Sequence, residues 1–214
     1  MERTAILIDG AYFLKRYRHT YGKGHSPEQV AKNLFAMCIK HLNETDNLYR
    51  IFFYDCPPFS KKVHNPISKE CIDFSKTAIF KFRTELHEEL VKLRKVALRL
   101  GRISDSGGGW SIRPRMMKEL LLGKITAEEV TEDDVVYSMN QKGVDIKMGL
   151  DIASIAYKKL ASRIVLVTGD SDFVPAAKFA RREGIDVILD PMWQPINKDL
   201  YTHIDGLKSH CPRR

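Results

Sequence analysis

Two aspartates, Asp170 and Asp172, lie two residues apart directly after the apolar run Arg163 to Thr168. Carboxylates held this close repel each other, and each raises the pKa of the other. A turn does not need such a pair, because one short polar side chain can cap the helix that follows. The spacing therefore points to a chemistry that uses negative charge, such as the binding of a divalent cation.

Two more aspartates occur at comparable places. Asp9 directly follows the apolar run Thr4 to Ile8, and Asp145 opens a predicted helix after a predicted strand. The carboxyl ends of parallel strands and the N-termini of the following helices meet at one edge of a sheet, so we expect Asp9, Asp145 and Asp170 to converge there. Their hard oxygens suit Mg²⁺ or Mn²⁺, which can activate water for an in-line displacement at phosphorus.

Asp145 and Asp151 lie on the same predicted helix and must be ranked. They are six residues apart, roughly 9 Å along the axis and about 120° around it, so both do not fit one tight cluster. Asp145 projects in the same direction as Ile152 and Ala156, toward the sheet. We therefore rank Asp145 as a metal ligand, and Asp151 as a weaker ligand or a residue that acts through the ligands.

Each acid also has a purely structural interpretation. An aspartate after a strand is often a helix N-cap, and Asp172 could cap a helix predicted to begin at Phe173. Asp55 precedes two prolines and Asp190 precedes another, so both are interpreted as turn residues. The recurrence of an acid after several separate strands favours a shared site over a set of independent caps.

Short apolar runs alternate with helical patterns along the sequence. A capping box at Ser26 opens one helix, and one long helix is predicted from about Phe74 to Leu100. Alternation of helices with strands buried on both faces predicts an α/β protein with a central parallel sheet. The predicted strands are Thr4–Ile8, Leu48–Tyr54, Val135–Ser138, Arg163–Thr168 and Ile185–Asp190, and further helices are predicted at 141–161 and 173–183.

The length and composition indicate one folded domain. The 214 residues contain no internal repeat, so we expect a single domain over residues 1–214 with an elaboration at about 56–134. Apolar residues make up 43% and no apolar run reaches the roughly 20 residues of a membrane span. With no signal-peptide pattern and four scattered cysteines, we expect a cytoplasmic protein without a membrane role, a zinc site or a disulfide framework.

The charge balance and the basic residues indicate the class of partner. There are 35 Lys and Arg against 27 Asp and Glu, a formal charge of +8, and a basic surface around an acidic pocket suits a polyanionic substrate. The candidates for nucleic-acid contact form three groups. The first follows the Asp9 motif within one or two helical turns, the second lies in the proline-rich loop after the second predicted strand, and the third joins an aromatic ring to two arginines. They are Lys15, Arg16 and Arg18; Lys61 and Lys62; and Trp110, for which a core position is an equal alternative, with Arg113 and Arg115.

Other phosphate chemistries fit less well. The sequence has neither the Gly-x-x-x-x-Gly-Lys-Ser/Thr loop nor a strand-linked Gly-x-Gly-x-x-Gly, so nucleotide-loop enzymes are disfavoured. A phosphatase that uses an aspartyl nucleophile would have a second acid two residues after Asp9, where Ala11 stands instead.

Three segments, AILIDGAYF, QKGVDIKMGLD and IVLVTGDSDFVPAAKFARREGIDVIL, together resemble the NYN domain in its LabA-like (DUF88) branch. The resemblance covers residues 3–17 and 135–200 well and the middle of the chain loosely. It implies a PIN-like nuclease fold, a Rossmannoid three-layer sandwich around a parallel sheet. It also implies metal-binding acids at Asp9, Asp145 and Asp170, with Asp172 and Asp151 assisting. The family usually has Asn where this sequence has Tyr12.

Two classes of function follow. The first hypothesis is a metal-dependent endoribonuclease, a hydrolase with catalytic Asp9, Asp145 and Asp170 that uses Mg²⁺ or Mn²⁺ and no other cofactor. Its partner is nucleic acid, with RNA favoured over DNA, and homo-oligomerisation is left open. The alternatives are a non-catalytic regulatory module on the same fold, which binds nucleic acid or protein, and a DNA-directed nuclease.

Overall fold

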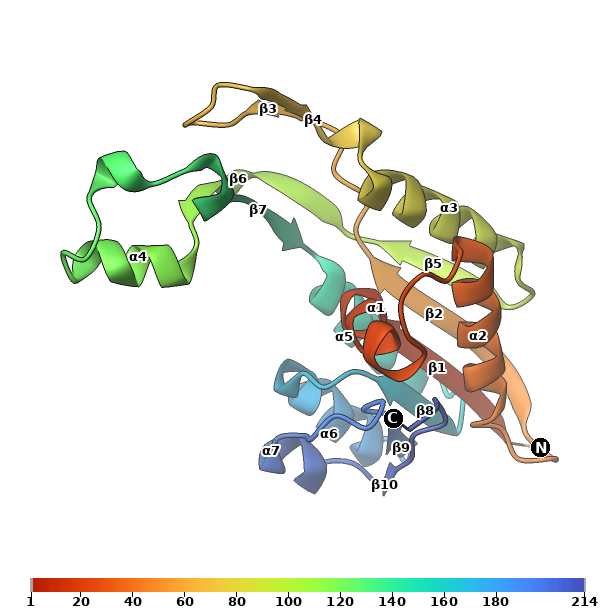
Figure 1. Ribbon diagram of the computed structural model, residues 1–214. Helices are drawn as coiled ribbons and strands as arrows, with labels where there is room; N and C mark the ends of the chain where they lie inside the picture. The colour runs from red at the N-terminus through yellow and green to blue at the C-terminus, as the bar shows by residue number, and fades with distance from the viewer. Residues whose placement is uncertain (1, 214) are drawn as a thin grey trace.

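Six parallel strands form the central sheet of the protein (Figure 1). The computed structural model describes residues 2–213, apart from the side chains of residues 105–107. Across the sheet the strands run in the order β10-β9-β8-β1-β2-β5. Numbered along the chain, this order is 3-2-1-4-5-6, which is that of doubly wound α/β folds. Their bounds are β1 Arg3–Asp9, β2 Asn47–Asp55, β5 Val96–Leu100, β8 Arg163–Val167, β9 Asp186–Leu189 and β10 Gly206–Leu207.

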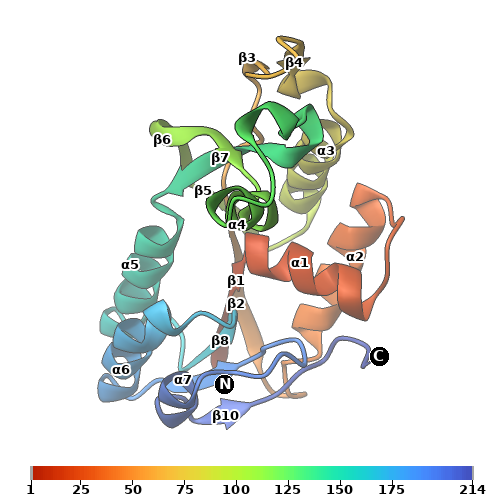
Figure 2. The same cartoon turned by 60° about the vertical axis from the view of Figure 1, so that its left-hand side comes forward.

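Helices cover both faces of the sheet (Figure 2). Side chains alternate along a strand, so Ile6 and Ile8 of β1 pack with the helices on one face, while Ala5 and Leu7 pack with those on the other. The first face carries α1 Gly10–Thr20, α2 Pro27–Ile39 and α3 Ala78–Lys92; the second carries α5 Val144–Tyr157, α6 Val174–Arg182 and α7 Lys198–Thr202. This three-layer arrangement confirms the predicted α/β class and is consistent with a PIN-like Rossmannoid fold.

The single long helix predicted from Phe74 to Leu100 is wrong in its second half. A short 3-10 turn at Phe74–Lys76 precedes α3, whose first turn is capped by Thr77. The helix ends at Lys92, and Lys95 takes a positive φ of 64° that redirects the chain. Residues 96–100 then form β5 and pair in parallel with Ile51–Asp55. The apolar residues at 96–100 have a spacing that fits a helix. They form a strand instead, because they pair with β2, which lies about 45 positions earlier in the sequence.

Two antiparallel hairpins extend beyond the sheet (Figure 1). The first pairs β3 Lys62–His64 with β4 Cys71–Asp73. The second, which we call the arm, pairs β6 Arg102–Ile112 with β7 Val135–Lys142 and carries α4 Pro114–Leu121 and two 3-10 turns, η2 Ala127–Glu129 and η3 Glu132–Asp134. Within the predicted elaboration at 56–134, α3 and β5 therefore belong to the layers of the sandwich, and the hairpins are its outer parts. None of the helices described has the length and apolar character needed to cross a lipid bilayer.

Candidate active site

The edge of the sheet where the strand order reverses lies between β1 and β8. From β1 the chain adds β2 and β5 on one side, and it then returns to place β8 on the other. Such a reversal leaves a crevice at the carboxyl ends of the two central strands. Because Ile8 is paired with Val167, the residues after both strands emerge side by side at this crevice. Asp9 and Asp170 are among them.

Two of the acids cap helical turns. Asp9 ends β1, and its Oδ1 accepts a hydrogen bond from the Tyr12 N–H at 3.0 Å, which caps α1. Asp170 caps the 3-10 turn η4, Ser171–Phe173, and accepts from the Asp172 N–H at 2.9 Å. No side chain caps α6, so the capping role considered for Asp172 is absent. Asp9 and Asp170 therefore do have the capping role considered for each acid. A carboxylate that caps a helical turn keeps its negative charge, so this role does not prevent the binding of a cation.

Asp145 comes from the first turn of α5. This helix begins at Val144, after Gly143 in the left-handed conformation (φ 82°), so it starts later than the predicted residue 141. Val144 packs against Gly101, where an added Cβ would lie 2.7 Å from Val144 Cγ2. This close approach anchors the start of α5 against the end of β5 and leaves the neighbouring Asp145 exposed.

The four acids form an electrostatically coupled cluster. Burial raises the pKa of Asp9 to about 6, and the charges of Asp145 and Asp170 contribute in the same direction against the Tyr12 N–H, which lowers it. The pKa of Asp145 is also raised, by burial first and then by Asp170 and Asp172. In the described part of the chain, no lysine, arginine or histidine forms an ion pair with any of them. The acidic cluster, Asp9, Asp145, Asp170 and Asp172, therefore carries uncompensated negative charge.

The donor set of the acidic cluster suits a hard divalent cation. Among the side chains that the structure describes, no three from Asp, Glu, His or Cys are grouped closely enough to form a complete ligand set. Mg²⁺ is commonly held by one or two carboxylates, with waters and substrate phosphates as its other ligands. An open group of carboxylates with one partly buried member fits that type of site better than it fits a closed cage of protein ligands.

Asp151 has partners of its own. Its Oδ2 accepts a hydrogen bond from the Tyr54 hydroxyl at 2.8 Å and lies 3.1 Å from Arg99 Nε. Tyr54 is fully buried in the core beneath α5. These contacts give Asp151 a structural role, and its assistance to a metal stays a prediction.

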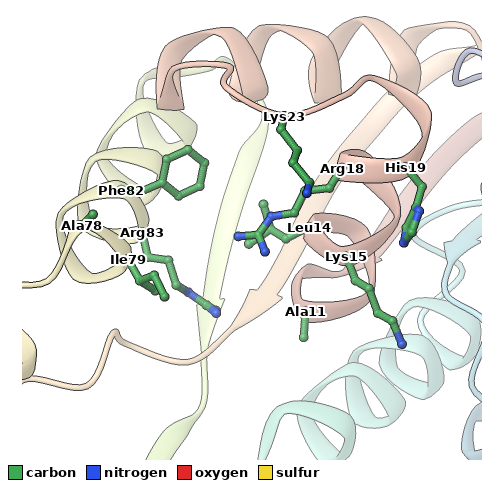
Figure 3. A pocket seen from close by; sticks show the side chains of 10 residues that line it. All are labelled: Ala11, Leu14, Lys15, Arg18, His19, Lys23, Ala78, Ile79, Phe82 and Arg83. Carbon is green, nitrogen blue, oxygen red and sulfur yellow. The ribbon is translucent and has the colours of Figure 1, made fainter. Parts of the chain in front are cut away.

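The basic residues of α1 divide between two of its faces. Lys15 and Arg18 share a face with Ala11 and line a cavity of about 710 Å³ between α1 and α3 (Figure 3). Arg16 is rotated by about 100° from its neighbour, since an α-helix has 3.6 residues per turn. Its Nη2 donates to the Met192 carbonyl at 2.8 Å. Arg16 therefore anchors the loop after β9 and does not line the cavity with Lys15 and Arg18.

The other predicted nucleic-acid contacts lie on the two hairpins. Lys62 on β3 faces Asp73 on β4 at 3.9 Å, and Lys61 directly precedes it. Trp110 packs edge to face against Tyr137 within the arm, with ring centroids 5.5 Å apart. None of these residues is in the lining of the cavity beside α1. The arginines of the arm have local partners: Arg113 Nε donates to the Asp133 carbonyl at 2.8 Å, and Arg115 Nε lies 3.4 Å from a Glu119 oxygen.

A buried group around Asp55 was missed by the sequence analysis. Asp55 is the last residue of β2, so its interpretation as a turn residue is wrong. It is 1% exposed; one oxygen accepts from Arg83 and from the Cys56 N–H, and the other lies 2.8 Å from His87 Nε2. Arg83 and His87 are one turn apart on α3. A basic pair at this spacing on the inner side of an amphipathic helix is a signal for a buried acidic partner.

Cys56 connects this group with the acidic cluster. Burial raises the pKa of its thiol, with Asp55 and Asp145 acting in the same direction and Arg83 in the opposite one. All three charged groups therefore lie near Cys56. The acidic cluster and Arg83 belong to the same edge of the sheet.

Tyr12 holds the turn that carries Asp170. Its hydroxyl donates to the Pro191 carbonyl at 2.7 Å. Its ring packs on Gly169 so closely that an added Cβ there would lie 2.7 Å from Tyr12 Cε2. The residue that replaces the family's usual Asn thus joins the turns after β8 and β9.

Residues 117–196 match the sequence model of the NYN domain. The match supports a relationship between this part of the chain and the NYN family. Because this is a nuclease-type family, the match also supports a PIN-like nuclease domain and a hydrolase, and it includes three of the four acids of the cluster, Asp145, Asp170 and Asp172. Asp9 lies outside the matched residues.

The fold has a counterpart among solved structures. The crystal structure of a protein of unknown function from Vibrio parahaemolyticus superimposes with a TM-score of 0.50 at 15% identity, over 96% of this chain and 91% of that chain. At this identity the likeness concerns the fold alone. No curated protein matches the sequence.

Proposed function

We propose that the protein is a metal-dependent endoribonuclease of the LabA-like (DUF88) branch, which hydrolyses RNA phosphodiester bonds with Mg²⁺ or Mn²⁺. The observation that carries the proposal is the acidic cluster at the switch point of the sheet, which has no basic partner in the described residues. Burial raises the pKa of Asp9 to about 6, and the negative charges of Asp145 and Asp170 add to that rise.

In this proposal Asp9, Asp145 and Asp170 would hold the cation, each directly or through a water molecule of the cation, and Asp172 would assist them. A bound cation would polarise the phosphoryl oxygen and lower the pKa of a water molecule. Without it, four carboxylates would repel a phosphodiester, because both carry negative charge. Lys15, one turn beyond Ala11 on α1, lines the neighbouring cavity and can neutralise a phosphate that approaches from that side.

The test uses the 214-residue protein with labelled single-stranded RNA and DNA, in Mn²⁺, in Mg²⁺ or in EDTA. We expect cleavage of RNA with either cation and none in EDTA. Asp170→Asn should lose the activity, although Asn caps a helical turn as well as Asp does. A cation that binds the native state should also raise the Tm of the wild type but not of the variant.

The alternatives are separate outcomes of the same experiment. Cleavage of DNA but not RNA would favour a DNA-directed nuclease. Binding of nucleic acid without cleavage in any cation would favour the non-catalytic module. One observation supports that module: Tyr12 replaces the family's usual Asn, and its hydroxyl donates to Pro191 at the adjoining turn. A wild type with neither a cation-dependent Tm shift nor cleavage would contradict the proposed metal site.

A further inference from the structure

The cavity between α1 and α3, which we call the α1–α3 cleft, is not explained by the acidic cluster. Its volume of about 710 Å³ lies within the usual range of ligand sites. Figure 3 shows Arg18 from one helix and Phe82 and Arg83 from the other extending toward the space between them. A second cavity of about 470 Å³ continues from it, since both are lined by Leu14, Arg18, Lys23 and Phe82.

The cleft carries positive charge that nothing nearby offsets. Its lining includes Lys15, Arg18, His19 and Lys23 but no acidic residue. Among residues 2–213, Lys15, Arg18 and Lys23 take part in no ion pair. Positive charges that line one cavity repel one another. A bound polyanion would neutralise them, so the arrangement fits a polyanionic ligand.

Arg83 is held in place at the opposite wall. Asp55 pairs with its guanidinium, and His87 and the Cys56 N–H in turn hold Asp55. Arg83 Nε is buried and has no hydrogen-bond partner among the described residues. A guanidinium presents five N–H donors in a rigid plane, and the Arg83 side chain is 20% exposed where it lines the cleft, so donors other than the buried Nε remain for a phosphate.

Apolar side chains lie between these charges. Leu14, Ile79 and Phe82 line the cleft, and Ile79 is 67% exposed. An aromatic ring beside basic groups is the arrangement on which unpaired bases stack while their phosphates are neutralised. A duplex keeps the faces of its bases inside its own stack, so this combination favours a single strand.

We propose that the α1–α3 cleft binds a single strand of RNA that leads away from the acidic cluster. Phosphates contact Lys15, Arg18, Lys23 and Arg83, and a base packs on Phe82. Ala11, at one end of the cleft, is two residues after Asp9, and Arg18 lies about 10 Å farther along α1. This inference deepens the proposed function and rests on it for the choice of RNA as the substrate.

The experiment measures binding of a fluorescent single-stranded RNA by anisotropy in EDTA, so that no cleavage is required. Arg18→Ala with Lys23→Ala should weaken binding about tenfold and reduce the slope of log affinity against log salt by about 1.4, as expected for two lost phosphate contacts. Phe82→Leu should weaken binding with an unchanged salt slope, because it removes a stacking surface and no charge. The matched control is Lys178→Ala with Arg182→Ala on α6, which removes the same charges from the other face of the sheet and should change neither quantity.

The outcomes separate this inference from the proposed function. Cleft-dependent binding of RNA by a protein that never cleaves it would support the cleft and contradict the nuclease. If the Arg18 and Lys23 double variant cleaves RNA and binds it with normal affinity, the nuclease is supported and the role of the cleft is contradicted. Equal losses in the cleft and control pairs, tighter binding of single-stranded DNA or of duplex RNA than of single-stranded RNA, or binding of polyglutamate in place of RNA would overturn the inference.

Discussion

Asp9 is a carboxyl group whose pKa differs between the folded and the unfolded chain. It lies partly buried beside Asp145 and Asp170, and its pKa rises from 3.8 to about 6. A raised carboxyl pKa means that the native state binds the proton more tightly than the unfolded state. The native state therefore loses stability as the pH rises from about 4 to 6, up to about 3 kcal/mol, and the loss persists above that range.

Asp9→Asn should accordingly stabilise the metal-free protein at pH 7, because it removes the buried charge and keeps a side chain that caps α1. Urea unfolding in EDTA at several pH values measures the difference from the wild type. The gain should approach zero at pH 4 and reach its full size above pH 6. An equal gain at pH 4 and pH 7 would show that the charge of Asp9 is not its source.

Asp145 and Asp151 should differ in stability as well as in activity. Asp151→Ala removes the acceptor of the buried Tyr54 hydroxyl, and an unsatisfied buried hydroxyl costs about 1–3 kcal/mol. Asp145→Ala removes a repelling charge at an exposed position, so urea unfolding should show no loss. Cleavage should be almost abolished in Asp145→Ala and reduced roughly 10- to 100-fold in Asp151→Asn.

The control for Asp151 is Tyr54→Phe with Asp151→Ala. This double variant should be more stable than the sum of the two single losses, because neither partner is then left without a hydrogen bond. If Asp151→Ala unfolds at the wild-type urea concentration, the bond to Tyr54 contributes nothing. Retained cleavage in Asp145→Ala together with its loss in Asp151→Asn would reverse the ranking of the two acids.

At the scale of elements, close approaches between backbone and side chains place the acids. Gly10 begins α1 so near β2 that a Cβ would lie 2.6 Å from the Tyr54 carbonyl oxygen. Gly169 stands in the same relation to the ring of Tyr12, at 2.7 Å. Only a residue without a side chain fits these two positions, and each adjoins an acid of the cluster.

Gly169→Ala should therefore destabilise the protein by about 1–3 kcal/mol, the usual cost of overpacking, and should lower cleavage by moving the turn that carries Asp170. Differential scanning fluorimetry and the nuclease assay measure the two effects. Gly169→Ala with Tyr12→Ala opens space for the added methyl, so its stability should exceed the sum of the single changes. Simple additivity would show that the ring of Tyr12 is not what restricts residue 169.

At the scale of the whole molecule, the sandwich and the arm differ in how they are stabilised. Two apolar cores, one on each face of the sheet, hold the helices to the strands. In contrast, no residue from 113 to 134 is buried, and the paired residues Ile112 and Val135 end the arm's hairpin ladder on either side of that segment. The outer part of the arm therefore contributes little to the stability of the sandwich.

Replacement of residues 113–134 by an Asn-Gly turn should leave the fold intact, because a two-residue turn suits an antiparallel pair that ends at Ile112 and Val135. We expect the Tm to change by less than about 3 °C, which circular dichroism measures. A Gly/Ser segment of the original length is the control for chain length. A large fall in Tm for both variants would show that the outer arm helps to stabilise the sandwich.

The sequence by itself determined the class of fold and the choice of the candidate acids. Strands buried on both faces read as continuous apolar runs, and an acid that directly follows such a run must lie at the carboxyl edge of a parallel sheet. The pattern is local, so Asp9 and Asp170 could be chosen from a few neighbours each, whereas Asp145 was chosen from the predicted start of its helix, since the strand before it, β7, belongs to the antiparallel arm. The cap at Ser26 was predicted for the same reason, and its hydroxyl accepts from the Gln29 N–H at 3.2 Å.

Only the tertiary structure decided which side chains meet. Residues 96–100 have an apolar spacing that fits a helix, and they become β5 because β2 offers them a partner. Asp55 precedes prolines like a turn residue, yet Arg83 and His87 bring their charges to it from another helix. Arg16 and Arg18 are two residues apart, and what packs on each face of α1 sends one to the loop after β9 and the other to the cleft. These outcomes depend on burial and on pairing between segments that are distant in the sequence, so a local sequence pattern does not predict them.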